Sequence, residues 1–417
     1  MIGLVQSLIT VVLFILVLGA LVIIHEIGHF ASARLAKVRV LEFGIGFPPR
    51  AKVLRNRGET LYTLNWLPIG GFVKLEGEDG ADASAPDPNA SAPAASGVVE
   101  AGITVGTVGA SIPPGFGTSG GVAYGAAASD PRSFAAQRWI TKMLILVAGV
   151  VMNIVLAFAI FTGIAWFASP YVGLTFFDVQ PDSPAATAGL QPGESIVAID
   201  GVRYQFMPGL ITGDTTLSGL KDRAGETVVL TIADTSGEQR DVNVTLRSPD
   251  EIDQQHGALG ISGVNKPFEA YFWGQYAQND LPTAIRYGLD QTVHWMGLIV
   301  SGLGQLVSSV ANDPTAPPPV SGPVGIATQI GDIFWNSGPI MLLYVAGILS
   351  ANLAVVNILP FPPLDGGRML MITLKRLLGA RMTVQAEQLT YMVGFVFLFA
   401  FIIWITGFDI VRGLGGS

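Results

Sequence analysis

The chain has 417 residues, of which 50% are hydrophobic and only 13% are charged, whereas soluble domains carry about 25% charged residues. This composition excludes an ordinary soluble protein and indicates a membrane protein with soluble parts. The net charge of −8 gives no reason to expect nucleic-acid binding. Cysteine is absent, which excludes disulfides and thiolate ligands, so any zinc site must use histidine and carboxylate groups.

The N-terminal stretch Met1–Ile24 has no charged side chain and is long enough to cross a bilayer, which takes about 20 residues. It has no basic beginning and no small-residue cleavage site after it, so residues 1–36 are predicted to be a retained transmembrane helix.

His25, Glu26 and His29 follow this stretch in an H-E-x-x-H pattern. On a helix, His25 and His29 share one face and can bind one metal ion. Glu26 lies beside them, where it can act as a general base towards a metal-bound water. The alternative is an interfacial cluster that only reaches towards the lipid headgroups.

Residues 37–80 are predicted to form a membrane-associated β region on the cytoplasmic side. Within it, Leu67–Leu75 carries Pro and Gly-Gly before an alternating run from Phe72 to Leu75, which predicts a strand or hairpin. The edge of such a strand could pair with an extended peptide, and packing of a re-entrant loop explains the pattern equally well.

Residues 81–131 are predicted to be a low-complexity cytoplasmic insertion, made mostly of Ala, Gly, Ser, Pro and Val. Lys and Arg are absent from Glu76 to Pro131. Composition favours a tolerated linker over a regulatory binding segment.

Three further uncharged apolar stretches predict spans at 139–169, 333–368 and 388–410, the second with a loop at its end. The segment 280–312 has apolar residues at helical spacing among Gly, Ser and Gln. We interpret it as an amphipathic, clamp-like surface helix, so the prediction is four spans.

Basic residues predict the orientation. The segment Arg34–Lys142 holds 11 of the 23 Lys and Arg residues, and Arg368–Arg381 holds four. The segment Pro170–Asp332 holds seven, against 18 acidic residues. The first two segments are therefore predicted to be cytoplasmic, and the third to lie outside.

A compact α+β domain is predicted at 171–265, inside the outer segment. Ser183–Gly201 reads as a short helix, a Pro-Gly turn and a strand ending in Asp-Gly, and further strands are expected at Val228–Ile232 and Val242–Leu246. The first pattern resembles a bacterial PDZ domain, a fold that binds extended peptides or chain ends. A steric role, keeping bulky substrates from the membrane site, is the alternative.

Two histidines and a glutamate do not complete a hydrolytic zinc site, which commonly has three protein ligands. Asp365 is the best candidate for the third, because it ends an uncharged run of 32 residues. Pro360, Pro362 and Pro363 prevent a regular helix before it, and broken backbone at membrane depth fits a ligand loop. The predicted topology brings Asp365 and the histidine pair to the same leaflet. The alternative role for Asp365 is a simple Asp-Gly turn.

Other polar residues are assigned by position. His256 and His294 lie in the outer segment and are treated as ordinary polar residues. Asn352, Asn357 and Asn153 lie in predicted spans, where amides usually hydrogen-bond neighbouring helices. Asn357 begins the ligand loop and is favoured for a functional role, whereas Asn153 is favoured for packing.

Together these motifs resemble the site-2 family of intramembrane zinc metalloproteases, of the RseP (regulator of sigma-E protease) type. The matching features occur in the family's order: His25–His29, Gly70–Lys74, Gly149–Asn153, the PDZ pattern and Asn357–Gly367. The resemblance implies that His25, His29 and Asp365 ligate Zn²⁺ and that Glu26 is the catalytic base and acid.

The resemblance also implies substrate-binding positions, which are Gly70, Gly71, Phe72, Val73, Asn352 and Asn357. It implies a multi-pass α-helical protein of the bacterial cytoplasmic (inner) membrane, with the active site near the cytoplasmic side and one extracytoplasmic PDZ domain. The implied substrates are single-span proteins, such as anti-sigma factors or remnant signal peptides, cut in regulated intramembrane proteolysis.

Two features depart from the RseP type, which has tandem PDZ domains and generally lacks this low-complexity insertion. Two other functions are alternatives, an intramembrane metal transporter and a catalytically silent membrane scaffold with a PDZ adaptor. A transporter needs ligands at several depths, whereas these candidates cluster at one, and the intact Glu26 argues against a silent scaffold.

Overall fold

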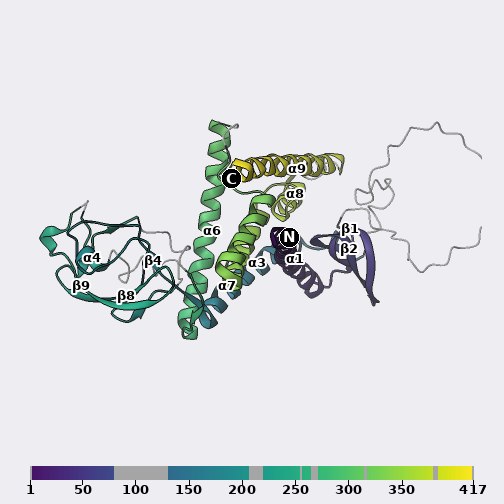
Figure 1. Cartoon of the computed structure of the whole chain (residues 1–417). Coiled ribbons are helices and arrows are strands. Elements are labelled where there is room, and N and C mark those ends of the chain that lie inside the picture. Colours follow the sequence, from purple (N-terminus) through teal and green to yellow (C-terminus); the bar gives the residue numbers. More distant parts are fainter. Residues whose placement is uncertain are drawn as a thin grey trace, which may run out of the picture. The chain divides into compact units, whose positions relative to one another are not determined.

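The computed structural model describes residues 2–78, 130–205, 219–253, 256–263, 271–313, 317–378 and 384–415 (Figure 1). The chain divides into two compact units. One comprises Met1–Phe14, Asn153–Val355 and Phe399–Ser417, and the other comprises Ile15–Met152 and Val356–Leu398. The predicted insertion at 81–131 lies outside the described residues, except for its last two positions.

The helices, labelled as in Figure 1, are α1 (Ile2–Leu35), α3 (Trp139–Phe167), α4 (Pro184–Thr187), α5 (Gly219–Asp222), α6 (Leu281–Asn312), α7 (Pro323–Asn357), α8 (Asp365–Leu378) and α9 (Val384–Gly415), with the 3₁₀ turn η1 (Pro249–Glu251). The strands are β1 (Val40–Arg57), β2 (Thr60–Leu75), β3 (Ser169–Val172), β4 (Leu174–Thr175), β5 (Asp178–Val179), β6 (Ser195–Ile199), β7 (Val202–Arg203), β8 (Thr227–Ala233), β9 (Gln239–Thr245), β10 (Ile261–Ser262) and β11 (Tyr271–Ala277).

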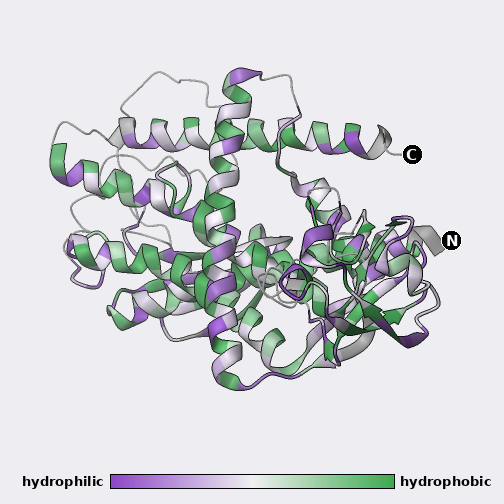
Figure 2. Cartoon of the chain, turned by 90° about the vertical axis from the view of Figure 1, so that its left-hand side faces the viewer, coloured by the Kyte–Doolittle hydropathy of each residue, from purple (hydrophilic) through white to green (hydrophobic). Residues whose placement is uncertain are grey.

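Five of the described helices are long and apolar enough to cross a membrane, which confirms a multi-pass helical protein (Figure 2). They are Val5–Leu35, Trp139–Phe167, Leu281–Asn312, Pro323–Asn357 and Glu387–Arg412. The third of these, in α6, has the lowest mean hydropathy, 1.3 against 2.0 to 3.1 in the others. It is the helix that the sequence predicts to be amphipathic.

Helix α7 begins at Pro323, ten residues before the predicted span at 333–368, and it is kinked at Gly338, whose φ of 81° is not helical, directly before Pro339. The helix already starts at Pro323, because Asp409 of α9 accepts hydrogen bonds from the backbone N–H groups of Gly322 and Gly325. At its other end α7 stops at Asn357, and residues 358–364 form the irregular loop expected from the prolines.

Strands β1 and β2 pair as one long, bent antiparallel hairpin. Both strands fold back on themselves, so that Ile45 pairs with Leu64 on one side and with Gly71 on the other. The last part of β2, Gly71–Leu75, therefore lies at one edge of the sheet, next to the first part of β1. The β region at 37–80 thus has the predicted strand, although it is longer than the alternating run alone suggested.

The segment predicted as an α+β domain contains its expected elements. Its main sheet has the order β4-β6-β8-β9, with β7 beside β6. The expected short helix is α4, and β6, β8 and β9 lie at the three expected strand positions. Buried apolar side chains of the sheet, including Ile196, Leu230 and Ile232, form its core.

Candidate metal centre

Three predicted ligands converge within one unit. His25 and His29 lie one turn apart on α1, and Asp365 is the first residue of α8. The Oδ2 atom of Asp365 is 2.9 Å from His25 Nε2 and 3.2 Å from His29 Nε2. The two Nε2 atoms are 3.1 Å apart. Among the described residues these three side chains form the one group of histidines and acids that could share a metal ion.

The orientation of His29 is set by the backbone of α3. Its Nδ1 atom lies 2.9 Å from the carbonyl oxygen of Ile145. A carbonyl only accepts hydrogen bonds, so Nδ1 carries the proton, and a neutral ring then presents its lone pair at Nε2. The lone pair therefore points towards His25 and Asp365.

These three atoms fit a zinc ion. Two imidazole nitrogens and a carboxylate oxygen, all bearing lone pairs at this spacing, would repel one another without a shared cation or proton. The ligand atoms of tetrahedral zinc, with bonds of about 2.0–2.2 Å, lie roughly 3.3–3.5 Å apart. The observed spacing of 2.9–3.2 Å is close to that value.

Two glycines allow α1 and α3 to approach closely at the histidines. A Cβ atom on Gly149 of α3 would lie 2.5 Å from His29 Nε2 and 2.7 Å from His25 Cε1. A Cβ atom on Gly28 of α1 would lie 2.4 Å from the carbonyl oxygen of Ala148. The two imidazole rings thus occupy space that a side chain at position 149 would fill.

The Asp365 side is held by glycines of the ligand loop. A Cβ atom on Gly366 would lie 2.2 Å from the carbonyl oxygen of Ile358, and one on Gly367 would lie 2.5 Å from Phe361. Gly394 of α9 packs in the same way against Pro362. Only glycine lets the loop fold back onto α8 and α9, so the Asp-Gly-Gly sequence fixes where Asp365 sits.

Glu26 lies on α1 between the two histidines and close to the sheet. A Cβ atom on Gly71 of β2 would lie 3.4 Å from Glu26 Cγ. Gly71, the first residue of the sheet edge Gly71–Leu75, therefore lies next to the side chain predicted to be catalytic. Phe72 lies opposite Gly44, where its ring fills the space of the missing side chain.

The asparagines and the other two histidines do not all lie near the three candidate ligands. Asn357 ends α7, directly before the ligand loop, whereas Asn352 belongs to the other unit. Asn153 is fully buried, and its carbonyl oxygen accepts a hydrogen bond from Ser350, consistent with packing. His256 pairs with Asp253 at the surface, and His294 contacts Trp295.

The roles of Ile145 and Gly149 at the histidines were not predicted from the sequence, although Gly149 begins one of the elements that match the family. The carbonyl of Ile145 leaves no signal in the sequence, because any residue supplies one. Gly149 was visible as a glycine inside an apolar helix, which is a position that often marks close packing. Nothing in the sequence indicated that its partner would be the histidine pair.

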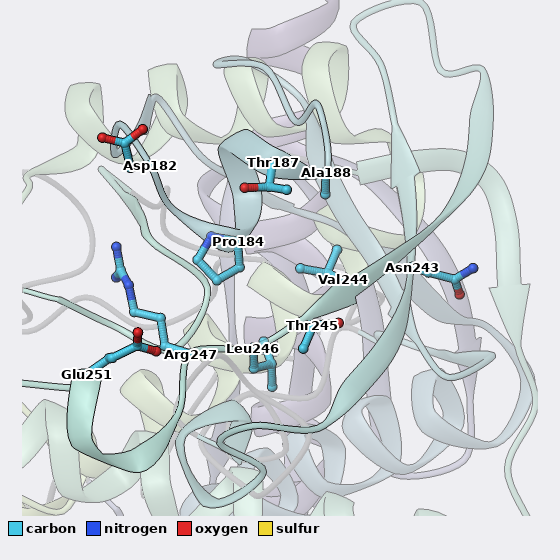
Figure 3. A pocket seen from close by; sticks show the side chains of 10 residues that line it. All are labelled: Asp182, Pro184, Thr187, Ala188, Asn243, Val244, Thr245, Leu246, Arg247 and Glu251. Atoms are coloured by element: carbon cyan, nitrogen blue, oxygen red, sulfur yellow. The ribbon is translucent and has the colours of Figure 1, made fainter.

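A groove of about 370 Å³ lies on the α+β domain, between α4 and β9 (Figure 3). Pro184 and Thr187 face Val244 and Leu246 across it, with Arg247 among the residues at one end. Its lining contains no histidine, so it is a surface separate from the metal centre.

The profile of peptidase family M50 matches residues 13–401, a stretch that includes both histidines and Asp365. The chain belongs to peptidase family M50. It is similar to the zinc metalloprotease RasP of Geobacillus kaustophilus, with 29% identity over 98% of this chain and 99% of the relative. The RasP of Oceanobacillus iheyensis is 28% identical over 97% and 99%, and the "Probable protease eep" of Enterococcus faecalis is 24% identical over 97% and 99%.

M50 membership, together with the five apolar helices, makes this chain a zinc metalloprotease of the membrane. It is of the site-2 type, as the motifs suggested. This result decides for a peptidase over the metal transporter and the silent scaffold. Zinc is the cofactor, and the His25, His29 and Asp365 group has the donor atoms and spacing that zinc requires.

Proposed function

We propose that His25, His29 and Asp365 hold the zinc ion of this M50 protease and that Glu26 transfers protons in peptide hydrolysis. The convergence of two imidazole nitrogens and one carboxylate oxygen within 3.2 Å of one another supports this assignment most directly. The nitrogens come from α1 and the oxygen from α8, and His25 and Asp365 are 340 residues apart in the chain.

When bound, zinc supplies Lewis-acid activation of a water and of the scissile carbonyl group. The carboxylate of Glu26 accepts a proton from the attacking water and passes it to the nitrogen of the leaving amine. The C–O bond to the attacking water forms first, and the C–N bond breaks after the nitrogen has received its proton, which gives one acid and one amine. Ile145 keeps the His29 ring in the tautomer that this role needs.

We propose that the substrate binds as an extended strand along Gly70, Gly71, Phe72 and Val73. A helical amide is hydrogen-bonded and shielded, so a transmembrane substrate must unwind before it is cut. The edge position of Gly71–Leu75 in the sheet and the closeness of Gly71 to Glu26 support this path. Asn352 and Asn357 are proposed to hold the substrate backbone.

We propose four spans, α1, α3, α7 and α9, in the bacterial inner membrane, with the metal centre near the cytoplasmic side. Helix α6 is proposed to be a clamp-like surface helix, supported by its low hydropathy and its mixed apolar and polar faces. The substrates are proposed to be single-span proteins, such as anti-sigma factors or remnant signal peptides, cut in regulated intramembrane proteolysis.

The α+β domain at 171–265 is proposed to be one extracytoplasmic PDZ domain that either binds a peptide or blocks bulky substrates. The groove between α4 and β9 supports a peptide-binding role, because β9 is the last strand of its sheet (Figure 3). The remaining domain boundaries, including the insertion at 81–131, are proposed as in the sequence analysis.

The decisive test is Glu26→Gln in the purified full-length protein with a model transmembrane peptide. We expect cleavage to fall at least about a thousandfold, since the amide cannot accept the proton, while the zinc content stays near one ion per chain. Asp365→Asn should lower the zinc content as well. Glu238→Gln, at an exposed turn of the α+β domain, is the matched control. Persistent cleavage in Glu26→Gln would refute the assigned role.

A further inference from the structure

Four basic side chains gather where α3 begins and α8 ends, and we call this surface the basic corner: Arg138, Lys142, Lys375 and Arg376. The two helices are joined there by Trp139, whose Nε1 donates a hydrogen bond to Thr373 Oγ1 at 3.1 Å. The guanidinium group of Arg376 lies over the Trp139 ring, 5.5 Å from its centroid. These contacts bring the basic residues of the two helices to one place.

The basic corner lies at the end of two membrane helices. Trp139 is the first residue of the span in α3, and Glu387 is the first residue of the span in α9. Lys375 Nζ is 2.8 Å from Glu387 Oε2, so α8 contacts the starts of both spans. Spans begin at the level of the lipid headgroups, and tryptophan prefers that level. The four basic groups therefore lie where headgroups lie.

The corner has more positive than negative charge. Arg138 and Arg376 are exposed, and neither forms an ion pair with any acid in the described part of the chain. Lys142 is half-buried, and its Nζ donates a hydrogen bond to the carbonyl oxygen of Ala135. Glu387 balances one of the four charges. The remaining excess is suited to an anionic group.

An exposed apolar side chain lies next to the corner. Leu377 of α8, beside Arg376, has 75% of its surface exposed. Ile140 and Leu144 of α3 are also exposed, but each lies two residues from Lys142 and therefore on the other face of the helix. A ligand that fits the corner has an anionic end at the four cations and hydrocarbon beside Leu377.

We propose that the basic corner binds the phosphate of an anionic phospholipid, with its acyl chains beside Leu377. Basic pockets between transmembrane helices recognise such headgroups, and each Lys or Arg near a membrane surface adds roughly 1 kcal/mol. A free phosphate ion would use the cations but not Leu377. An acidic soluble peptide would have to replace lipid at the ends of both spans.

The proposal is tested with the full-length protein in mild detergent, by native mass spectrometry with added phosphatidylglycerol or phosphatidylcholine. We expect retention of phosphatidylglycerol over phosphatidylcholine. The double variant Arg138→Gln/Arg376→Gln should bind phosphatidylglycerol about 30-fold more weakly, as expected from two cations at roughly 1 kcal/mol each. Arg138→Lys/Arg376→Lys should bind within about threefold of the parent protein.

The control is Lys52→Gln/Arg55→Gln, which removes two exposed cations from β1 in the same unit. It should leave phosphatidylglycerol retention unchanged. Equal retention of both lipids, or an equal loss in the control, would overturn the proposal. Displacement of the lipid by millimolar inorganic phosphate would also overturn it, since that result makes the corner a site for free anions. Thermal unfolding of each variant shows that it is folded.

Discussion

Among single residues, Gly149 is as important to the candidate metal centre as the three proposed ligands and Glu26, because it has no side chain. The imidazole rings of His25 and His29 lie against Gly149, where a methyl group would lie 2.5 Å from His29 Nε2. His29 is also tied to the backbone of α3 at Ile145, so its ring cannot move away without losing that hydrogen bond. The geometry of the proposed ligands is therefore sensitive to a single carbon atom on α3.

We predict that Gly149→Ala lowers the zinc content and reduces cleavage of a transmembrane peptide by about tenfold or more. Overpacking of this kind costs about 1–3 kcal/mol, and here the strain falls on two proposed ligands. Gly163→Ala on the same helix is the matched control, because nothing lies within 4 Å of its added Cβ. It should keep zinc and activity and be neutral or up to about 1 kcal/mol more stable. Full zinc content in Gly149→Ala would show that the rings have room to shift.

At the scale of elements, the two ends of the segment 79–129 are joined. Arg39 contacts Glu76, which precedes the segment, at 2.8 Å, and Asp130, which follows it, at 3.4 Å. The backbone N–H of Phe134 donates to the carbonyl oxygen of Glu76 at 2.7 Å. Glu76 and the residues Asp130 and Phe134 therefore lie next to one another, so a short connection is enough to join the two described ends.

We predict that replacing residues 79–129 with a short Gly-Ser linker preserves zinc content and leaves cleavage of a model transmembrane peptide within about twofold. The measurement is the initial cleavage rate of the purified variant beside that of the parent protein. Arg39→Ala in the full-length chain is the comparison, and it should lower the melting temperature because it removes the ion pairs at the junction. A large loss of cleavage in the linker variant, with zinc retained, would place part of the active site in the removed segment.

For the whole molecule, the five apolar helices allow either four or five spans. The two arrangements differ in whether the α+β domain and the end of α6 lie on the same side of the membrane. Four spans with α6 at the surface keep Ser236 of the α+β domain and Asn312, the last residue of α6, on one side. A crossing α6 would separate them. The absence of natural cysteine makes single-cysteine labelling unambiguous.

We predict that Ser236→Cys and Asn312→Cys are both labelled by a membrane-impermeant maleimide on intact spheroplasts. Ala136→Cys, before α3, should be labelled only after the membrane is permeabilised. The cysteine-free parent protein is the control for background labelling. Labelling of Ser236→Cys without Asn312→Cys would show that α6 crosses the bilayer, and external labelling of Ala136→Cys would reverse the proposed orientation.

Many of the helices, the short elements of the α+β domain and the histidine pair could be predicted, because the patterns that specify them lie within short segments. Helical spacing places His25 and His29 on one face, uncharged runs mark the long helices, and Pro-Gly and Asp-Gly turns bound the short elements of the α+β domain. The start of α7 was not predictable from its own residues. It is capped by Asp409, a residue 84 positions after Gly325, and such a distant partner cannot be read from local sequence.

Short sequence patterns were enough to predict the kind of chemistry and its membrane setting, since both depend on residue type and spacing within short segments. The sequence also indicated Asp365 as the third ligand, through the single acid that ends a long uncharged run. The folded chain was needed to show that this carboxylate lies 2.9 Å from His25, that Ile145 orients His29, and that Gly149 makes room for both rings. Those relations depend on how α1, α3 and α8 pack, and packing is set by long-range contacts that no local pattern specifies.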